Sequence, residues 1–93
     1  MSGEEFRAIL RFNKIKFLTF AEYLGYRSNK TVKEVMDMKV IPYTFQLKLG
    51  EMLGLDLFDD KNLNLILKDI PLKYYEKQRK VKKVSLINDI FKL

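Results

Sequence analysis

The stretch "GYRSNKTVKEVMDMKVIP", residues 25–42, holds a polar turn, a short helical pattern and a proline stop. Val32, Val35 and Met36 have the spacing of one apolar helix face, which predicts a helix over residues 29–38. The outward positions of that helix are polar: Lys30, Lys33, Glu34 and Asp37. Pro42 ends any element that precedes it, because the residue before a proline is biased away from helical backbone conformation. The pattern fits either a helix that reads DNA or an ordinary helix of a small core.

The sequence on both sides predicts further short helices. Ser2 and Glu5 form a capping box, so a first helix begins at once and runs to about residue 12. "FLTFAEYLG", residues 17–25, predicts a second helix that Gly25 ends. Ser28 or Asn29 can cap the next helix by accepting a hydrogen bond from a free backbone N–H of its first turn.

Two more segments follow the proline. "YTFQLKLGEMLG", residues 43–54, predicts a helix with Gly54 after it, and Gly50 inside it indicates close packing against another helix. "NLNLILKDI", residues 62–70, fits a helix and a strand equally well. We therefore expect an all-α fold, a compact bundle of four to five helices in residues 1–70. A basic extension, residues 71–93, follows, and its pattern leaves helix and strand open.

The composition removes several function classes. The chain has 93 residues, which suits one domain, and it contains no Cys and no His. Ordinary zinc sites, Ser-His and Cys-His pairs and histidine acid–base chemistry are thereby excluded. We expect no enzyme activity, no catalytic residue, no cofactor and no metal site. An acidic start and the lack of a long apolar run predict a cytoplasmic protein rather than a secreted or membrane protein.

The positive charge is concentrated in the last third of the chain. The formal net charge is +6 at pH 7. Residues 1–60 carry nine Lys or Arg and nine Asp or Glu, whereas residues 61–93 carry nine Lys or Arg and three Asp or Glu. A basic surface indicates a polyanionic partner such as nucleic acid.

Three stretches in this order, "FAEYLGY", "SNKTVKEVM" and "KVIPYTFQLKLGEMLGLDL", resemble the Cro and lambda-repressor type (XRE-like) helix-turn-helix domain. The resemblance covers about residues 4–60. The positions that match the family pattern are Ala21, Leu24, Gly25, Thr31, Val32, Val35, Lys39, Pro42, Leu49, Leu53, Gly54 and Leu55. It implies a sequence-specific DNA-binding transcriptional regulator, a repressor that binds double-stranded DNA as a homodimer, of the kind found in phage, plasmid or antitoxin circuits.

The resemblance also implies site residues. Those that would face base edges are Asn29, Lys30, Lys33 and Glu34. Thr31 and Lys39 would contact phosphate. Lys16 and Arg27 lie next to the two helix starts, where phosphate is favoured by the helix dipole.

The chain departs from the family pattern at Phe17, where Gln is usual. This departure and the neutral charge of residues 1–60 keep a second interpretation open. In that interpretation the same fold binds a protein partner, as an adaptor, antirepressor or host-takeover factor.

The extension carries two kinds of residue. The basic ones, which we expect to contact phosphate, are Lys77, Arg79, Lys80, Lys82 and Lys83. The apolar ones, which we expect to form a dimer interface, are Val84, Leu86, Ile87, Ile90 and Phe91. A basic amphipathic segment can also lie on an anionic membrane, but nothing else in the chain indicates a membrane.

Overall fold

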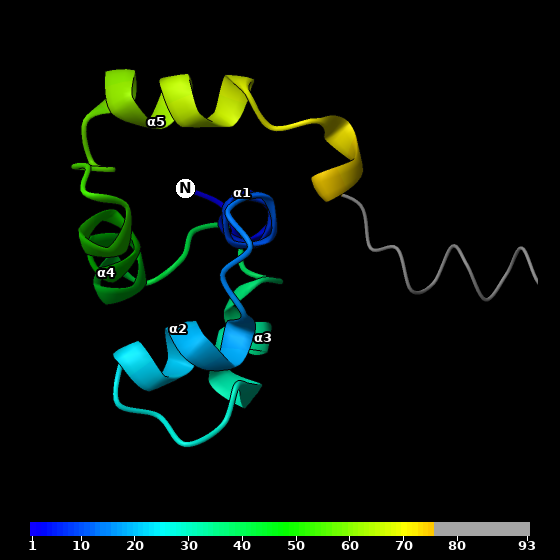
Figure 1. Cartoon of the computed structure of the whole chain (residues 1–93), viewed down its shortest axis with the longest axis vertical. Coiled ribbons are helices and arrows are strands. Elements are labelled where there is room, and N and C mark those ends of the chain that lie inside the picture. Colours follow the sequence, from blue (N-terminus) through cyan, green and yellow to red (C-terminus); the bar gives the residue numbers. More distant parts are fainter. Residues whose placement is uncertain (76–93) are drawn as a thin grey trace, which may run out of the picture.

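The first helix, α1 (Gly3–Phe12), begins at the capping box that the sequence predicts. Ser2 Oγ accepts a hydrogen bond from Glu5 N at 3.1 Å, and Glu5 Oε1 accepts one from Ser2 N at 2.9 Å. Two backbone N–H groups that the helix itself cannot satisfy are thus paired. In Figure 1, α1 lies in the middle of the molecule, with the other helices around it.

The computed structural model describes residues 1–75. After α1, these residues form α2 (Phe17–Tyr23), α3 (Lys30–Val35), α4 (Tyr43–Leu53), α5 (Asp60–Lys68) and a single 3₁₀ turn, η1 (Leu72–Tyr74). No strand occurs among residues 1–75, so the all-helical class is confirmed for this part of the chain. The segment 62–70, which fits both periods, lies largely in α5.

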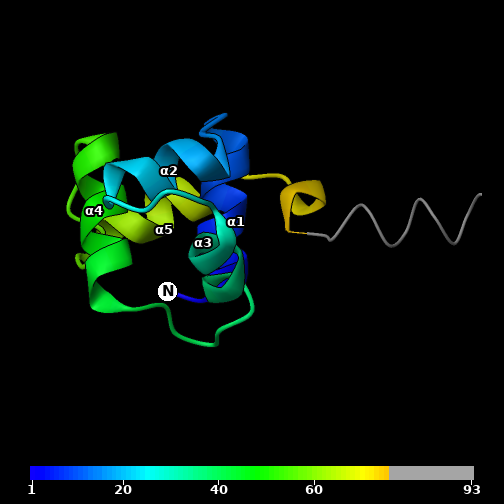
Figure 2. The same ribbon diagram turned by 90° about the horizontal axis from the view of Figure 1, so that it is seen from below.

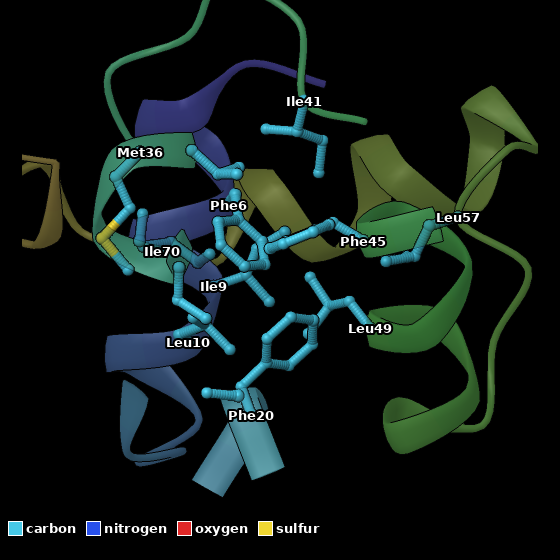
Figure 3. Packing of buried hydrophobic residues seen from close by; sticks show 14 residues of the cluster. Phe6, Ile9, Leu10, Phe20, Met36, Ile41, Phe45, Leu49, Leu57 and Ile70 are labelled. Carbon is cyan, nitrogen blue, oxygen red and sulfur yellow. The ribbon is translucent and has the colours of Figure 1, made fainter. Parts of the chain in front are cut away.

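Three phenylalanines from three helices form the centre of the hydrophobic core (Figure 3). The Phe6 ring meets the Phe20 ring edge-on with centroids 5.1 Å apart, and the Phe45 ring at 6.0 Å. Ile9 and Leu49 are fully buried beside them. Burying each such side chain stabilises the fold by roughly 1.5–3 kcal/mol relative to leaving it exposed. The core therefore joins α1, α2 and α4.

Gly50 is packed against the chain that follows α4, whereas the sequence predicts packing of Gly50 against another helix. A Cβ at Gly50 would lie 2.5 Å from the carbonyl oxygen of Leu55, which belongs to the chain just after α4 and not to another helix. The chain reverses at Gly54, whose φ is 75°, and Leu55 N donates to Gly50 O at 2.9 Å. Gly54 thus ends α4 as predicted, while the expectation of a helix–helix contact at Gly50 is wrong.

The helix predicted over residues 29–38 is shorter in the structure, where α3 covers only Lys30–Val35. The N-terminal segment holds the backbone that follows α3. Gly3 N donates to Met38 O at 2.8 Å, and Ile41 N donates to Met1 O at 3.0 Å. The predicted cap is also weaker, because Asn29 makes no side-chain hydrogen bond to α3 and Ser28 Oγ lies 3.5 Å from Lys30 N. Contacts with the N-terminal segment accompany the early end of α3.

The first residues of the predicted extension pack against α1. The Arg11 side chain donates from Nη1 to Tyr74 O at 2.9 Å, and the buried Arg7 side chain donates to Tyr75 O. The Phe12 and Tyr74 rings meet edge-on, 5.4 Å apart. These contacts hold η1 on one side of α1, where Figures 1 and 2 show it beside the helices.

Candidate functional site

The helix α3 is anchored by its inner face. Val32 is fully buried, and Val35 and Met36 are 4% and 6% exposed. α2 and α3 pack directly against each other, and Figure 2 shows them side by side near one face of the molecule. Gly25, with a φ of 91°, follows α2, and residues 24–29 lead from α2 to α3. Burial of one face fixes which side chains of α3 point to solvent.

The outer face of α3 lines an open hollow of about 370 Å³. The residues that line it are Asn29, Lys30, Lys33, Glu34 and Asp37. Asn29 is half-buried, and the other four are exposed. The structure therefore brings together all four residues for which the resemblance implies base contacts. Their side chains offer ammonium and amide donors together with amide and carboxylate acceptors.

A second hollow, of about 360 Å³, lies next to the first and shares Asp37 with it. Its lining residues come from two distant parts of the chain: Ser2, Glu4, Met36, Asp37, Met38 and Lys39. Lys39 thus lies at the same surface as the carboxylates of Glu4 and Asp37. Together the two hollows form a continuous surface, polar except for Met36 and Met38, which we call the α3 surface.

Charge is distributed unevenly between two segments of the described chain. Residues 14–39 carry six Lys or Arg and three Asp or Glu, a net +3. Residues 51–60 carry four Asp or Glu and no Lys or Arg, a net −4. In Figure 1, α2 and α3 lie together at one end and α5 lies at the other. The segment that contains α2 and α3 therefore carries a net positive charge, and the end of α4 with the turn into α5 carries a net negative charge.

The remaining residues predicted to contact phosphate lie between the start of α2 and the chain just after α3, or outside the described residues. Lys16, Arg27 and Lys39 are exposed, and Thr31 is half-buried. Lys16 occupies the N-cap position of α2 and makes no side-chain capping bond there. The other predicted positions lie beyond residue 75: Lys77, Arg79, Lys80, Lys82 and Lys83 for phosphate, and Val84, Leu86, Ile87, Ile90 and Phe91 for the dimer interface.

Two acidic residues belong to the α3 surface besides Glu34. Asp37 is predicted by periodicity as an outward position of this helix, although the resemblance implies no base or phosphate contact for it. Glu4 enters the surface from α1, more than thirty positions earlier in the chain than Lys39. No local pattern in the sequence connects Glu4 with α3.

Neither a metal cluster nor a membrane span is found in the described part of the chain. Among residues 1–75, no group of three or more Asp or Glu side chains is placed to hold a metal ion. No helix in the same range has the length and apolar character needed to cross a bilayer.

Comparisons with protein-family models, curated proteins and solved structures found no match to this chain.

Proposed function

We propose that the protein is a sequence-specific regulator that binds double-stranded DNA, with α2 and α3 acting as a helix-turn-helix unit of the Cro and lambda-repressor type. The observation that supports this most strongly is the arrangement of α3. Its inner face is buried, and Asn29, Lys30, Lys33 and Glu34 line one open surface on the other side. In helix-turn-helix proteins the second helix enters the major groove, and residues near its N-terminal end contact base edges.

The chemistry of these side chains suits the major groove. Lys30 and Lys33 can donate to the O6 and N7 acceptors of guanine, and Glu34 can accept from the amino group of cytosine. Asn29 can bond adenine through two hydrogen bonds. A good pair of this kind contributes about 1–3 kcal/mol of discrimination against the wrong base.

The exposed cations around α3 supply sequence-independent affinity in this proposal. Lys16 lies at the start of α2, and Arg27 and Lys39 flank α3 in the sequence. All three are exposed and would contact phosphate. Each neutralised phosphate releases condensed counterions, so binding should weaken steeply with salt. Regulation would follow from occupancy of the site and needs no chemical step.

A second candidate function is recognition of a protein partner by the α3 surface. The specific observation that favours it is charge balance, because Lys30 and Lys33 are matched in the hollow by Glu34 and Asp37. A formally neutral mixture of donors and acceptors suits the polar rim of a protein interface. It attracts a phosphate backbone less than a surface of cations alone.

Selection of bound fragments from a random double-stranded DNA pool, at physiological salt, distinguishes the two candidates. DNA recognition predicts an enriched motif that the purified protein binds at least 10³-fold more tightly than a scrambled duplex, within the usual range of specific binders. A pool without enrichment, together with equal affinity for all duplexes, would reject DNA reading and favour a protein partner.

A further inference from the structure

A second open surface, which shares no residue with the α3 surface, is apolar. It is a groove of about 350 Å³ formed where the ends of α1 and α4 meet α5, and we call it the α1–α5 groove. Its lining residues are Phe12, Asn13, Leu53, Leu55, Leu65, Ile66 and Asp69. Three of the apolar ones are well exposed: Phe12 at 38%, Leu55 at 42% and Leu65 at 55%. Exposed apolar residues that gather in one groove mark an interaction site.

The apolar surface continues from the groove onto the outer side of α4. A neighbouring hollow of about 340 Å³ shares Leu55 and adds Leu47 and Phe58. The Phe58 ring stacks on the exposed Tyr43 ring with centroids 4.7 Å apart. The acidic residues Glu51 and Asp56 line the same hollow. An occupant of this surface should therefore be apolar and should carry positive charge.

We propose that the α1–α5 groove binds the C-terminal segment of the same chain, residues 84–93. Six of those ten residues are apolar: Val84, Leu86, Ile87, Ile90, Phe91 and Leu93. So many apolar side chains in ten residues need a partner surface, because leaving each in water forfeits roughly 1.5–3 kcal/mol. The groove offers such a surface within the same molecule.

The groove lies next to the point at which the described chain ends. The ring of Phe12, a lining residue, meets the Tyr74 ring with centroids 5.4 Å apart. Arg11 Nη1 donates a hydrogen bond to Tyr74 O at 2.9 Å. Eight residues, 76–83, separate the end of the described chain from residue 84, and eight residues can span at most about 26–29 Å. A short tether gives the attached segment an effective local concentration in the millimolar range. The chain's own segment therefore outcompetes the same segment of a second copy at ordinary protein concentrations.

Charge complementarity supports the same occupant. Residues 77–83 carry five Lys or Arg and no acidic residue. Residues 51–69, which include the walls contributed by α5 and the end of α4, carry five Asp or Glu and two Lys. Asp69 itself lines the groove. Basic residues that precede the docking segment would thus run along the acidic end of the molecule, where the opposite charges attract.

This proposal assigns residues 84–93 to an intramolecular contact, whereas the sequence alone predicts a dimer interface there. It does not depend on whether α3 reads DNA. A cross-linking experiment on the full chain separates the possibilities, and the absence of native Cys makes it clean. The test variant carries Leu65→Cys and Ile90→Cys. The matched control carries Leu18→Cys and Ile90→Cys, because Leu18 is a similarly exposed leucine, at 43%, on α2.

Intramolecular docking predicts that mild oxidation of the dilute Leu65→Cys, Ile90→Cys variant yields a cross-linked monomer at least tenfold faster than oxidation of the control. A disulfide-linked dimer would overturn the proposal in favour of a second copy. Equal rates in the two variants would overturn it in favour of an unoccupied groove.

A second measurement keeps the test decisive if an engineered Cys disturbs folding. Leu65→Ser and Ile90→Ser are compared singly and together in the full chain by the midpoint of urea unfolding. Residues in contact show non-additive effects, so the double variant should shift the midpoint by less than the sum of the single shifts. Additive shifts would overturn the proposal.

Discussion

The substitution Gly3→Ala tests how α1 holds the end of α3. Gly3 is buried in the first turn of α1, and a Cβ added there would lie 2.4 Å from Met36 O and 2.5 Å from Val35 O. Both atoms belong to backbone, which cannot rotate away as a side chain can. To accept the methyl group, α1 and the last turn of α3 must separate, or the 2.8 Å hydrogen bond from Gly3 N to Met38 O must lengthen.

The expected free-energy change combines three terms. Overpacking of a tight contact costs about 1–3 kcal/mol. Weakening the Gly3–Met38 hydrogen bond adds about 0.5–1.5 kcal/mol. Ala is a better helix former than Gly, which returns at most about 1 kcal/mol. We therefore expect Gly3→Ala to lower the free energy of unfolding by about 0.5–4.5 kcal/mol.

Urea unfolding followed by far-UV circular dichroism measures this change, provided that the slope of the transition is unchanged. Asn64→Ala, at an exposed position of α5, is the control, because it reports helix propensity without a new close contact. It should leave stability unchanged or raise it slightly. A Gly3→Ala variant as stable as the parent would refute the close approach of α1 and α3.

Three further predictions concern the core, the contact of Tyr75 with α1 and the α3 surface. Leu49→Ala should cost about 2–5 kcal/mol in urea unfolding, because Leu49 is fully buried and leaves a cavity. Leu47→Ala on the same helix, at 38% exposure, should cost much less, and equal losses would contradict the core assignment. Burial and the nearby Glu5 carboxylate raise the pKa of Tyr75 above its usual 10.0, so the folded chain retains this proton more strongly than the unfolded chain. The resulting stabilisation is complete below about pH 10 and is lost as the pH rises through the folded-state pKa. Tyr75→Phe should abolish this loss of stability when the free energy of unfolding is measured as the pH rises from about 10. The same dependence of stability on pH in Tyr75→Phe and the parent would contradict the burial of Tyr75. Lys39→Ala should weaken DNA binding for all sequences and reduce the slope of log affinity against log salt by about 1, whereas a change confined to one base would exclude a phosphate contact.

Local patterns predict those elements whose causes are local. The capping box of Ser2 and Glu5 fixes the start of α1, and the left-handed Gly54 fixes the end of α4, as the structure confirms. The apolar spacing of Val32 and Val35 likewise predicts which side of α3 is buried. In each case the residues that decide the geometry lie within one or two helical turns of each other.

The differences arise where distant residues decide the outcome. The helix α3 is shorter than its pattern predicts, and Gly3 and Met1 hold the backbone that follows it. Gly50 is needed because the chain turns back over α4 at Leu55, which helix periodicity does not reveal. For the α3 surface, periodicity places Lys30, Lys33, Glu34 and Asp37 on one side of the helix. Only the fold brings in Glu4 from α1.

A base-resolution binding profile of Lys30→Ala tests most directly whether α3 reads DNA. The parent protein, Lys30→Ala and the control Lys61→Ala, which changes an exposed lysine of α5, are compared on all single-base variants of the selected motif. Recognition by α3 predicts that Lys30→Ala loses about 1–3 kcal/mol of binding free energy and tolerates any base at one position, while Lys61→Ala keeps the parent's preferences. Identical base preferences in the parent and Lys30→Ala would contradict the proposed role of Lys30.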